Sequence, residues 1–189
     1  MRDIVLLDEI HAQIQKCTKC VLSRTRTHAV PGEGAADAAV MFVGEAPGKS
    51  EDAQGRPFVG PAGKFLSEML AGIGLKRSDV YISNVVKCRP PDNRDPQPGE
   101  VETCTEEYLF AQMALIQPKI VCALGRFAMG VLLDPAMSIM RVHGTVYRRS
   151  GVLYLPIIHP AAALHQESNR RLVEQDFQKL AAVLRGEAL

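Results

Sequence analysis

The sequence predicts an α/β fold in which a parallel sheet of four strands is covered by helices on both faces. Three observations indicate this fold. Four apolar runs of strand length are spread along the 189 residues. Segments with helical spacing of apolar residues lie between them, an alternation typical of parallel sheets. No internal repeat or low-complexity run interrupts the pattern, so we expect residues 1–189 to form a single domain with one core.

Each predicted strand is a continuous apolar run, which is typical of a strand buried on both faces of a parallel sheet. The first run ends in Gly44. The fourth contains Pro156, which has no amide N–H for a neighbouring strand, so we expect the strand to be weakened there. In chain order the predicted strands are 39–43, 80–86, 119–125 and 152–158.

The predicted helices are recognised by apolar residues that recur at helical spacing. Gly72 or Gly74 is expected to end the second helix. Pro98 is expected to open the third, because proline suits the first helical turn. In chain order the predicted helices are 4–16, 65–73, 98–117, 127–133 and 173–184.

The formal net charge of +1 argues against a protein that binds nucleic acid through its overall charge, although a local basic face remains possible. No stretch approaches the roughly 18 apolar residues of a membrane span. Acidic residues enter the first nine positions too early for a signal peptide. We therefore expect a soluble, cytoplasmic protein with no membrane partner, whose cysteines are metal ligands or free thiols rather than disulfides.

Four cysteines have the spacing of a metal site. Cys17 and Cys20 form a C-x-x-C pair, and Cys88 and Cys104 follow with residues 89–103 between them. Four thiolates suit zinc or an iron–sulfur cluster. The wide spacing favours a cluster over a zinc ribbon, but zinc and four unrelated thiols both remain as alternatives. Cys122 lies inside an apolar run and is expected to be a small core residue.

Glycine or polar residues stand at the carboxyl ends of all four predicted strands: Gly44 and Glu45, Asn84, Gly125, and His159. Ligands of open parallel sheets bind outside these strand ends. The placement therefore predicts a ligand site there, because core packing alone would not put polar residues at strand ends selectively.

Several of these side chains have chemistry that suits a planar ligand. Glu45 could accept from an N–H group of a base or handle a water molecule. Phe58 lies in a Gly/Pro loop, which favours an exposed stacking face over a core plug. The amide of Asn84 could read the donor–acceptor edge of a pyrimidine, or could bond a neighbouring loop. His159 could simply be packed, but its strand-end position favours a functional role.

Basic residues near these segments could follow phosphate groups, although the usual role of surface arginines is solvation. They are Arg24, Arg26, His28, Lys87, Arg89, Arg94, Arg148, Arg149, Arg170 and Arg171.

Five motifs together resemble the family 4 uracil-DNA glycosylases, the iron–sulfur uracil glycosylases of bacteria and archaea. They occur in the family's order at residues 44–48, 55–63, 84–91, 93–94 and 159–162. The resemblance runs from Cys17 to about Ala163. It implies an α/β/α sandwich, and it implies that the chain excises uracil from DNA in base excision repair. It also implies a [4Fe-4S] cluster held by the four cysteines.

The resemblance also implies roles for the strand-end residues. Gly44, Glu45 and Ala46 would form the first uracil-binding loop, and Glu51 matches an acidic position near the pocket. Phe58 would stack on the flipped base, Asn84 would read its edge, and His159 would donate to a carbonyl oxygen of the leaving uracil. Glu45 and His159 would be catalytic, with water activation and uracil binding both open for Glu45.

The chain departs from the family's pattern after the motif at 159–162. The family often continues with Leu-Leu-Arg, whereas residues 163–166 here are Ala-Leu-His-Gln, which leaves Leu164 as the candidate for entering the duplex. No histidine-bearing insertion lies between Lys87 and Pro98, so we do not expect the covalent DNA adduct of a related branch. The expected partner is uracil-containing DNA, bound by a monomer. The alternatives are a non-catalytic binder of damaged bases and an electron-transfer protein.

Overall fold

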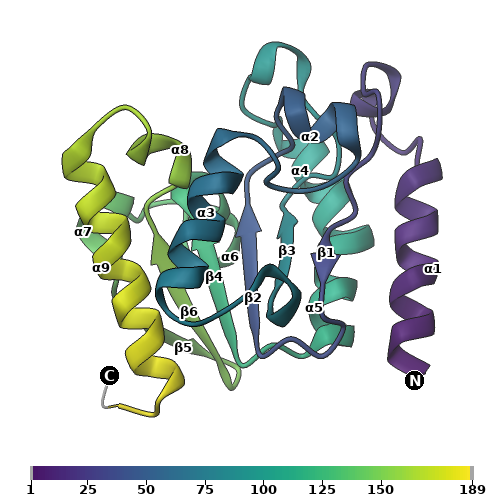
Figure 1. The fold of residues 1–189 in the computed structure, drawn as a ribbon. Coiled ribbons are helices and arrows are strands. Elements are labelled where there is room, and N and C mark those ends of the chain that lie inside the picture. Colours follow the sequence, from purple (N-terminus) through teal and green to yellow (C-terminus); the bar gives the residue numbers. More distant parts are fainter. Residues whose placement is uncertain (1, 188–189) are drawn as a thin grey trace.

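A computed structural model describes residues 2–187 and shows a single mixed sheet between two layers of helices (Figure 1). In these residues the strand order is β1-β3-β2-β4-β6-β5. The four central strands are parallel, which confirms the predicted parallel sheet: β3 (Tyr81–Asn84), β2 (Val40–Gly44), β4 (Ile120–Leu124) and β6 (Val152–Ile157).

Two short antiparallel strands at the edges were not predicted. β1 (Glu33–Gly34) pairs with β3, and β5 (Tyr147–Arg149) pairs with β6. They have two and three residues and are mostly not buried, so they lack the apolar run that identified the central strands. Only the neighbouring strand makes these segments extended.

Side chains of the central strands alternate between two cores, as the period of two in a strand requires. Met41 and Val43 face the core shared with α1 (Arg2–Lys16), α5 (Phe110–Ile116) and α6 (Gly125–Leu132). Phe42 faces the core shared with α3 (Pro61–Gly72) and α9 (Glu167–Leu184). The predicted three-layer α/β/α sandwich is therefore confirmed.

The helices differ from the predicted ones in several places. The segment predicted as one helix over 98–117 consists of α4 (Pro98–Cys104), a π-helical turn over Thr105–Leu109, and then α5. The last helix begins at Glu167 rather than near 173, because its first turns are polar and carry no apolar stripe. Short helices and turns that were not predicted are α2 (Lys49–Gln54), α7 (Ile139–Val142), α8 (Pro160–Ala163), and turns at Val21–Arg24, Arg77–Asp79 and Pro91–Asn93.

β6 continues through Pro156, so the predicted weakening of this strand is wrong. β5 pairs with β6 only over Val152–Tyr154, and Pro156 lies beyond that pairing. Its carbonyl accepts from the N–H of Gly144 on the same side, 2.9 Å away. The nitrogen and carbonyl of a strand residue face the same neighbour. The missing N–H of Pro156 therefore deprives no strand of a hydrogen bond.

The parallel register brings the carboxyl ends of the four central strands to one edge of the sheet. Gly44 pairs with Asn84, and Leu124 pairs with Ile157, so the residues that follow each strand lie side by side. This edge is therefore where the predicted ligand site must form. In residues 2–187, no helix is long and apolar enough to cross a bilayer.

Candidate active site and thiol cavity

A pocket of about 390 Å³ opens at the carboxyl ends of the central strands. Six of the seven predicted base-site residues line it, and the seventh, Gly44, lies directly beneath. The lining consists of Glu45, Ala46, Pro47, Gly48, Glu51, Phe58, Ala62, Asn84, Pro90, Asn93, Arg94, His159 and Ala161.

Gly44 forms the floor of the pocket because no larger residue fits there. A Cβ atom at Gly44 would lie 2.4 Å from Asn84 Oδ1 and 2.7 Å from the Phe58 ring. Both distances are far below van der Waals contact. The glycine therefore lets an amide and an aromatic ring approach the same point of the pocket.

Asn84 carries a buried acceptor that the protein leaves unpaired. The residue is 1% exposed at the end of β3. Within residues 2–187, its Oδ1 is a buried side-chain atom without a hydrogen-bond partner. Leaving such an atom unpaired costs free energy, so a ligand N–H is the natural complement. The alternative, in which this oxygen would accept a hydrogen bond from a neighbouring loop, is not realised among residues 2–187.

His159 is held in one orientation by the helix that it caps. Its Nδ1 accepts from the backbone N–H of Ala161 at 3.1 Å, at the start of α8. Burial lowers the pKa of His159 to about 4, although the negative charge of Glu51 opposes this. The ring is therefore neutral near pH 7. Because Nδ1 is an acceptor, the single ring proton is assigned to Nε2, which is a donor.

Phe58 is buried, which makes the predicted exposure of its ring wrong. It is 7% exposed and packs in the core on the α3 and α9 face. Its ring also lines the pocket, with its centroid 5.8 Å from that of His159. The sequence suggested a choice between a core plug and a stacking face. In the folded chain one side of the ring packs inward while another borders the pocket.

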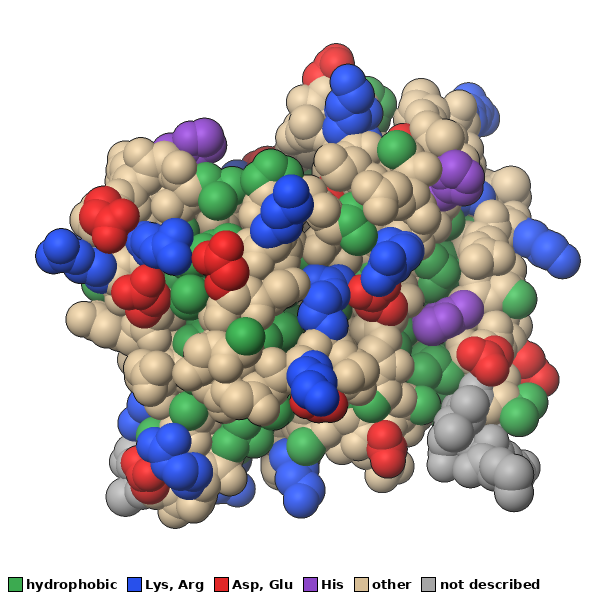
Figure 2. Space-filling model, in the orientation of Figure 1, with side chains coloured by type: hydrophobic (Ala, Val, Ile, Leu, Met, Phe, Trp, Pro, Cys, Tyr) green, Lys and Arg blue, Asp and Glu red, His purple; other side chains and the backbone are tan. Residues whose placement is uncertain are grey.

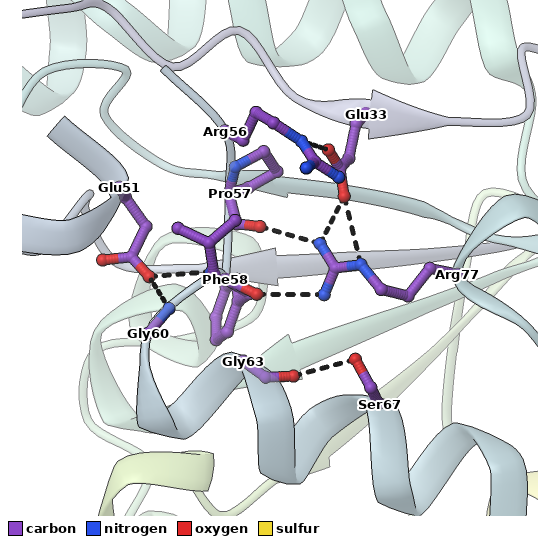
Figure 3. Close-up of polar contacts among 10 residues, drawn as sticks. Glu33, Glu51, Arg56, Pro57, Phe58, Gly60, Gly63, Ser67 and Arg77 are labelled. Carbon is purple, nitrogen blue, oxygen red and sulfur yellow. Dashed lines mark hydrogen bonds and ion pairs between the residues drawn. The ribbon is translucent and has the colours of Figure 1, made fainter. Parts of the chain in front are cut away.

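The carboxylate of Glu51 already accepts hydrogen bonds from the loop that carries Phe58. Its Oε1 accepts from the backbone N–H groups of Val59 and Gly60, both at 2.9 Å (Figure 3). This carboxylate lines the pocket but already serves two donors. Its first role is therefore to hold the loop in place.

Glu45 is the half-buried carboxylate at the pocket wall. Burial raises its pKa, the negative charge of Asp95 raises it further, and Arg126 opposes both. Arg126 and Asp95 form an ion pair of 2.5 Å between the start of α6 and the loop before α4. Sequence patterns could not predict this pair, because its members are 31 residues apart and exposed.

The four predicted cysteines line one cavity on the other side of the 84–88 segment. Cys88 and Cys104 are buried, and the other two are half-buried. In residues 2–187 no three His, Cys, Asp or Glu side chains are grouped closely enough to hold one metal ion. The four thiols therefore share one cavity without converging on one point.

Three of the four sulfur atoms accept hydrogen bonds, which would stabilise them as thiolates. Arg26 Nη1 donates to Cys88 Sγ at 3.0 Å. The backbone N–H of Lys87 donates to Cys104 Sγ at 3.3 Å, and that of Lys19 donates to Cys17 Sγ at 3.5 Å. A cavity that offers donors to sulfur fits a set of negatively charged ligands.

Lys87 is buried and cannot follow phosphate groups as predicted. It is 1% exposed, and its Nζ donates to Ser83 Oγ and to the Asn84 carbonyl, both at 2.7 Å. It also lines the thiol cavity. Lys87 therefore connects the pocket and the cavity. The predicted strand 80–86, which leads directly into Lys87, is a sequence signal that could have indicated this.

The face that presents α3 and α9 carries basic and acidic side chains side by side rather than in separate patches (Figure 2). Arg170, for example, pairs with Glu68 and Glu174. This mixed surface agrees with the net charge of +1.

Comparisons with known proteins fit this geometry. A family profile described as "Uracil DNA glycosylase superfamily" matches residues 31–185, which include every pocket residue but not the first cysteine pair. A type-4 uracil-DNA glycosylase of Archaeoglobus fulgidus is 50% identical over 182 residues, which cover 92% of this chain and 91% of the relative. A type-4 enzyme of Thermotoga maritima is 42% identical over 186 residues, which cover 96% of each. The solved structure of Pedobacter heparinus SMUG2 aligns with a TM-score of 0.48 and 14% identity, over 79% of this chain and 76% of that one.

Proposed function

This chain belongs to the uracil DNA glycosylase superfamily, and we propose that its strand-end pocket receives uracil turned out of DNA. It is a uracil-DNA glycosylase, a DNA repair enzyme that hydrolyses the bond between uracil and deoxyribose. The unpaired Oδ1 of Asn84 is the observation that carries the assignment of the pocket. In this proposal residues 1–189 act as one domain and one monomer. A cytoplasmic location suits the free thiols.

The uracil must leave the duplex before the enzyme can act on it. The bond to be cut lies within the stacked helix, so the nucleotide is flipped into the pocket. Leu164 follows α8 and is 43% exposed. It is close in sequence to His159 and Ala161, which line the pocket. It is therefore available to fill the space that the base vacates.

Asn84 selects uracil by its hydrogen-bonding edge. Its Oδ1 accepts from N3–H of uracil, and its amide nitrogen donates to the O4 carbonyl. Cytosine presents an acceptor at N3 and a donor at the neighbouring position. It would therefore leave the buried Oδ1 facing another acceptor, which costs free energy.

His159 stabilises the leaving base. When the glycosidic bond breaks, negative charge develops on uracil and its carbonyl oxygens. The neutral ring of His159 donates its Nε2–H to one of these carbonyl oxygens. The hydrogen bond from the Ala161 amide to Nδ1 has already fixed the orientation of the ring. A donor fixed before the reaction stabilises the transition state without further reorganisation.

Glu45 handles the water that attacks the sugar. Cleavage leaves positive charge on the sugar, which a nearby carboxylate stabilises. The raised pKa of Glu45 makes its carboxylate a better base toward water. Glu51 is less suited to this role, because two backbone amides occupy one of its oxygens. Uracil binding is the alternative role for Glu45.

Cys17, Cys20, Cys88 and Cys104 would hold a [4Fe-4S] cluster. The four thiols in one cavity, the N–H donors to three sulfurs, and the type-4 relatives support this assignment. When bound, such a cluster supplies strong iron–thiolate bonds between separated parts of the chain. These residues would tie the segment after α1 to the end of β3 and to α4.

The test is incubation with an oligonucleotide that contains one uracil, followed by alkaline scission. We expect cleavage at the uracil position and release of free uracil, with an otherwise identical thymine oligonucleotide left intact. Binding of the uracil strand without scission would identify the non-catalytic binder instead. Redox cycling without uracil release would favour the electron-transfer alternative.

A further inference from the structure

The backbone at Phe58 has an unusual conformation that other residues must hold in place. Its φ is +50°, in the left-handed region that residues other than glycine avoid. Such a conformation persists only where the surrounding contacts determine it. The contacts of this loop therefore decide where the ring lies relative to the base pocket.

The loop over residues 57–60 is held by hydrogen bonds to its backbone amides from one side and to its backbone carbonyls from the other (Figure 3). Glu51 accepts from the amides that follow Phe58. Arg77 Nη1 donates to the Phe58 carbonyl at 3.0 Å, and its Nη2 donates to the Pro57 carbonyl at 2.8 Å. A Cβ at Gly63 would lie 1.8 Å from the Phe58 carbonyl oxygen, so α3 packs directly against the same group. Both peptide units around Phe58 are fixed.

Arg77 is itself held by Glu33 of the edge strand β1. Arg77 Nε donates to Glu33 Oε1 at 3.1 Å, and Nη2 forms an ion pair with the same oxygen. Burial alone would raise the pKa of Glu33, but hydrogen bonds from Arg56 and Arg77 hold it below its usual value. The carboxylate is therefore charged at neutral pH. A planar guanidinium suits this place, because it can serve a carboxylate and two carbonyls at once.

Arg77 cannot act on the base directly. It lines a separate surface hollow with Glu33 and Arg56 rather than the base pocket. Among residues 2–187, its hydrogen bonds toward the pocket go to the carbonyls of Pro57 and Phe58. The ring that these carbonyls orient borders the pocket next to His159.

We propose that Arg77, anchored by Glu33, is a positioning residue that holds the Phe58 ring in its stacking orientation before uracil enters. The inference rests on the proposed function, because it takes Phe58 as the stacking face. A ring fixed in advance loses no conformational freedom when the base arrives, which strengthens binding. The short edge strand β1 thereby has a functional role, because it supplies the anchor for Arg77.

Arg56 provides a matched control. It donates to the other oxygen of Glu33 at 2.8 Å, but no hydrogen bond joins its side chain to a loop carbonyl among residues 2–187. Its side chain is 61% exposed. Arg56→Met therefore removes an arginine from the same carboxylate without releasing the carbonyls of Pro57 and Phe58.

The experiment is a double-mutant cycle with Phe58→Leu and Arg77→Met, read out by the inhibition constant of free uracil. Leucine keeps the core filled but removes the aromatic face. Phe58→Leu should weaken uracil binding by about 5- to 150-fold, the range for loss of base stacking. Arg77→Met should weaken it by a smaller factor, about 5- to 10-fold, because the ring remains but is no longer held. Arg56→Met should change it by less than about twofold.

The decisive result is the double variant. If Arg77 acts through the ring, Arg77→Met should change uracil affinity by less than about twofold once Phe58 is leucine. Independent losses that multiply in the double variant would overturn the inference, as would wild-type affinity in Arg77→Met. Wild-type affinity in Phe58→Leu would instead refute the stacking role in the proposed function.

Folding is checked by circular dichroism, and all variants are compared at a temperature where each is folded. If Arg77→Met does not fold, Glu33→Gln takes its place in the cycle, because it removes the anchor and leaves the guanidinium. The same non-additivity with Phe58→Leu is then expected, and multiplied losses would again contradict the inference.

Discussion

The base pocket and the thiol cavity differ in whether the folded chain satisfies their polar atoms. In the pocket, Asn84 Oδ1 is buried without a partner in residues 2–187. In the cavity, three sulfur atoms already accept N–H hydrogen bonds, from Arg26 and from the backbone. The pocket therefore leaves a buried acceptor free for a ligand, whereas most of the sulfur atoms in the cavity already have hydrogen-bond donors from the chain itself.

The two regions also differ in how the chain builds them. The pocket is assembled at the ends of strands that are paired with one another and packed between two cores. The cavity joins Cys17 and Cys20 after α1 to Cys88 beyond β3 and Cys104 at the end of α4. Substitutions in the pocket should therefore reduce function with little loss of folding, while those in the cavity should reduce both. Five predictions test this contrast, from the largest expected effect to the smallest.

Cys88→Ala should cause the largest loss. The wild-type protein, purified without air, is expected to be brown and to contain about four irons per chain. The variant should lose the iron and much of its soluble yield, because metal binding and folding are coupled. Iron analysis and the visible absorbance measure this, with His159→Ala as the pocket control that keeps its iron. A soluble Cys88→Ala protein with full iron content would contradict the expected difference between the thiol cavity and the base pocket.

His159→Ala should slow single-turnover release of uracil by about 100- to 1000-fold, the usual effect of removing one fixed donor to a developing oxyanion. DNA affinity should change little, since the donor acts mainly on the leaving base. Rapid-quench release assays and DNA titrations separate the two quantities. A variant that releases uracil at the wild-type rate would mean that the reaction occurs elsewhere.

Glu45→Gln should slow release by about 100-fold, within the range for loss of a general base. Uracil and DNA binding should remain, because glutamine keeps the size of the side chain and its carbonyl acceptor. Single-turnover rates and the inhibition constant of free uracil distinguish the two roles. A loss confined to affinity would make Glu45 a recognition residue.

Asn84→Asp should lower the preference for uracil over cytosine by about tenfold, within the range for changing one base-edge contact. A carboxylate only accepts, so it no longer matches uracil at both positions but can accept from the amino group of cytosine. The rates of base release from uracil and cytosine oligonucleotides, measured under the same conditions, give the ratio that expresses this preference. An unchanged ratio would show that another group reads the base.

The fifth prediction concerns the pH dependence of stability rather than the release of uracil. Burial lowers the pKa of His159 from 6.5 to about 4. Between these values the unfolded chain binds a proton that the folded chain does not. The stabilising contribution of the neutral ring is therefore complete above pH 6.5 and is lost as the pH falls toward 4. Urea unfolding should show wild type losing stability relative to His159→Gln over this range. A pH-independent difference would contradict the buried, neutral ring.

Much of this architecture was readable from local patterns. The continuous apolar runs identified the four central strands, because a strand covered on both faces needs apolar side chains at every position. Glu45, Asn84 and His159 were found because polar residues after such runs must lie at one edge of a parallel sheet. The spacing of the cysteines indicated a shared site, and the structure brings all four to one cavity.

Contacts between distant segments could not be read in this way. The backbone carbonyl of Phe58 accepts from Arg77, 19 residues later, and Arg77 pairs with Glu33 in a strand of two residues. Lys87 was predicted to lie at the surface, but residues from other parts of the chain bury it. The sequence by itself determined the four central strands and the polar residues that end them, because those patterns are local. Only the tertiary structure decided which buried polar groups have partners, because each partner comes from another part of the chain.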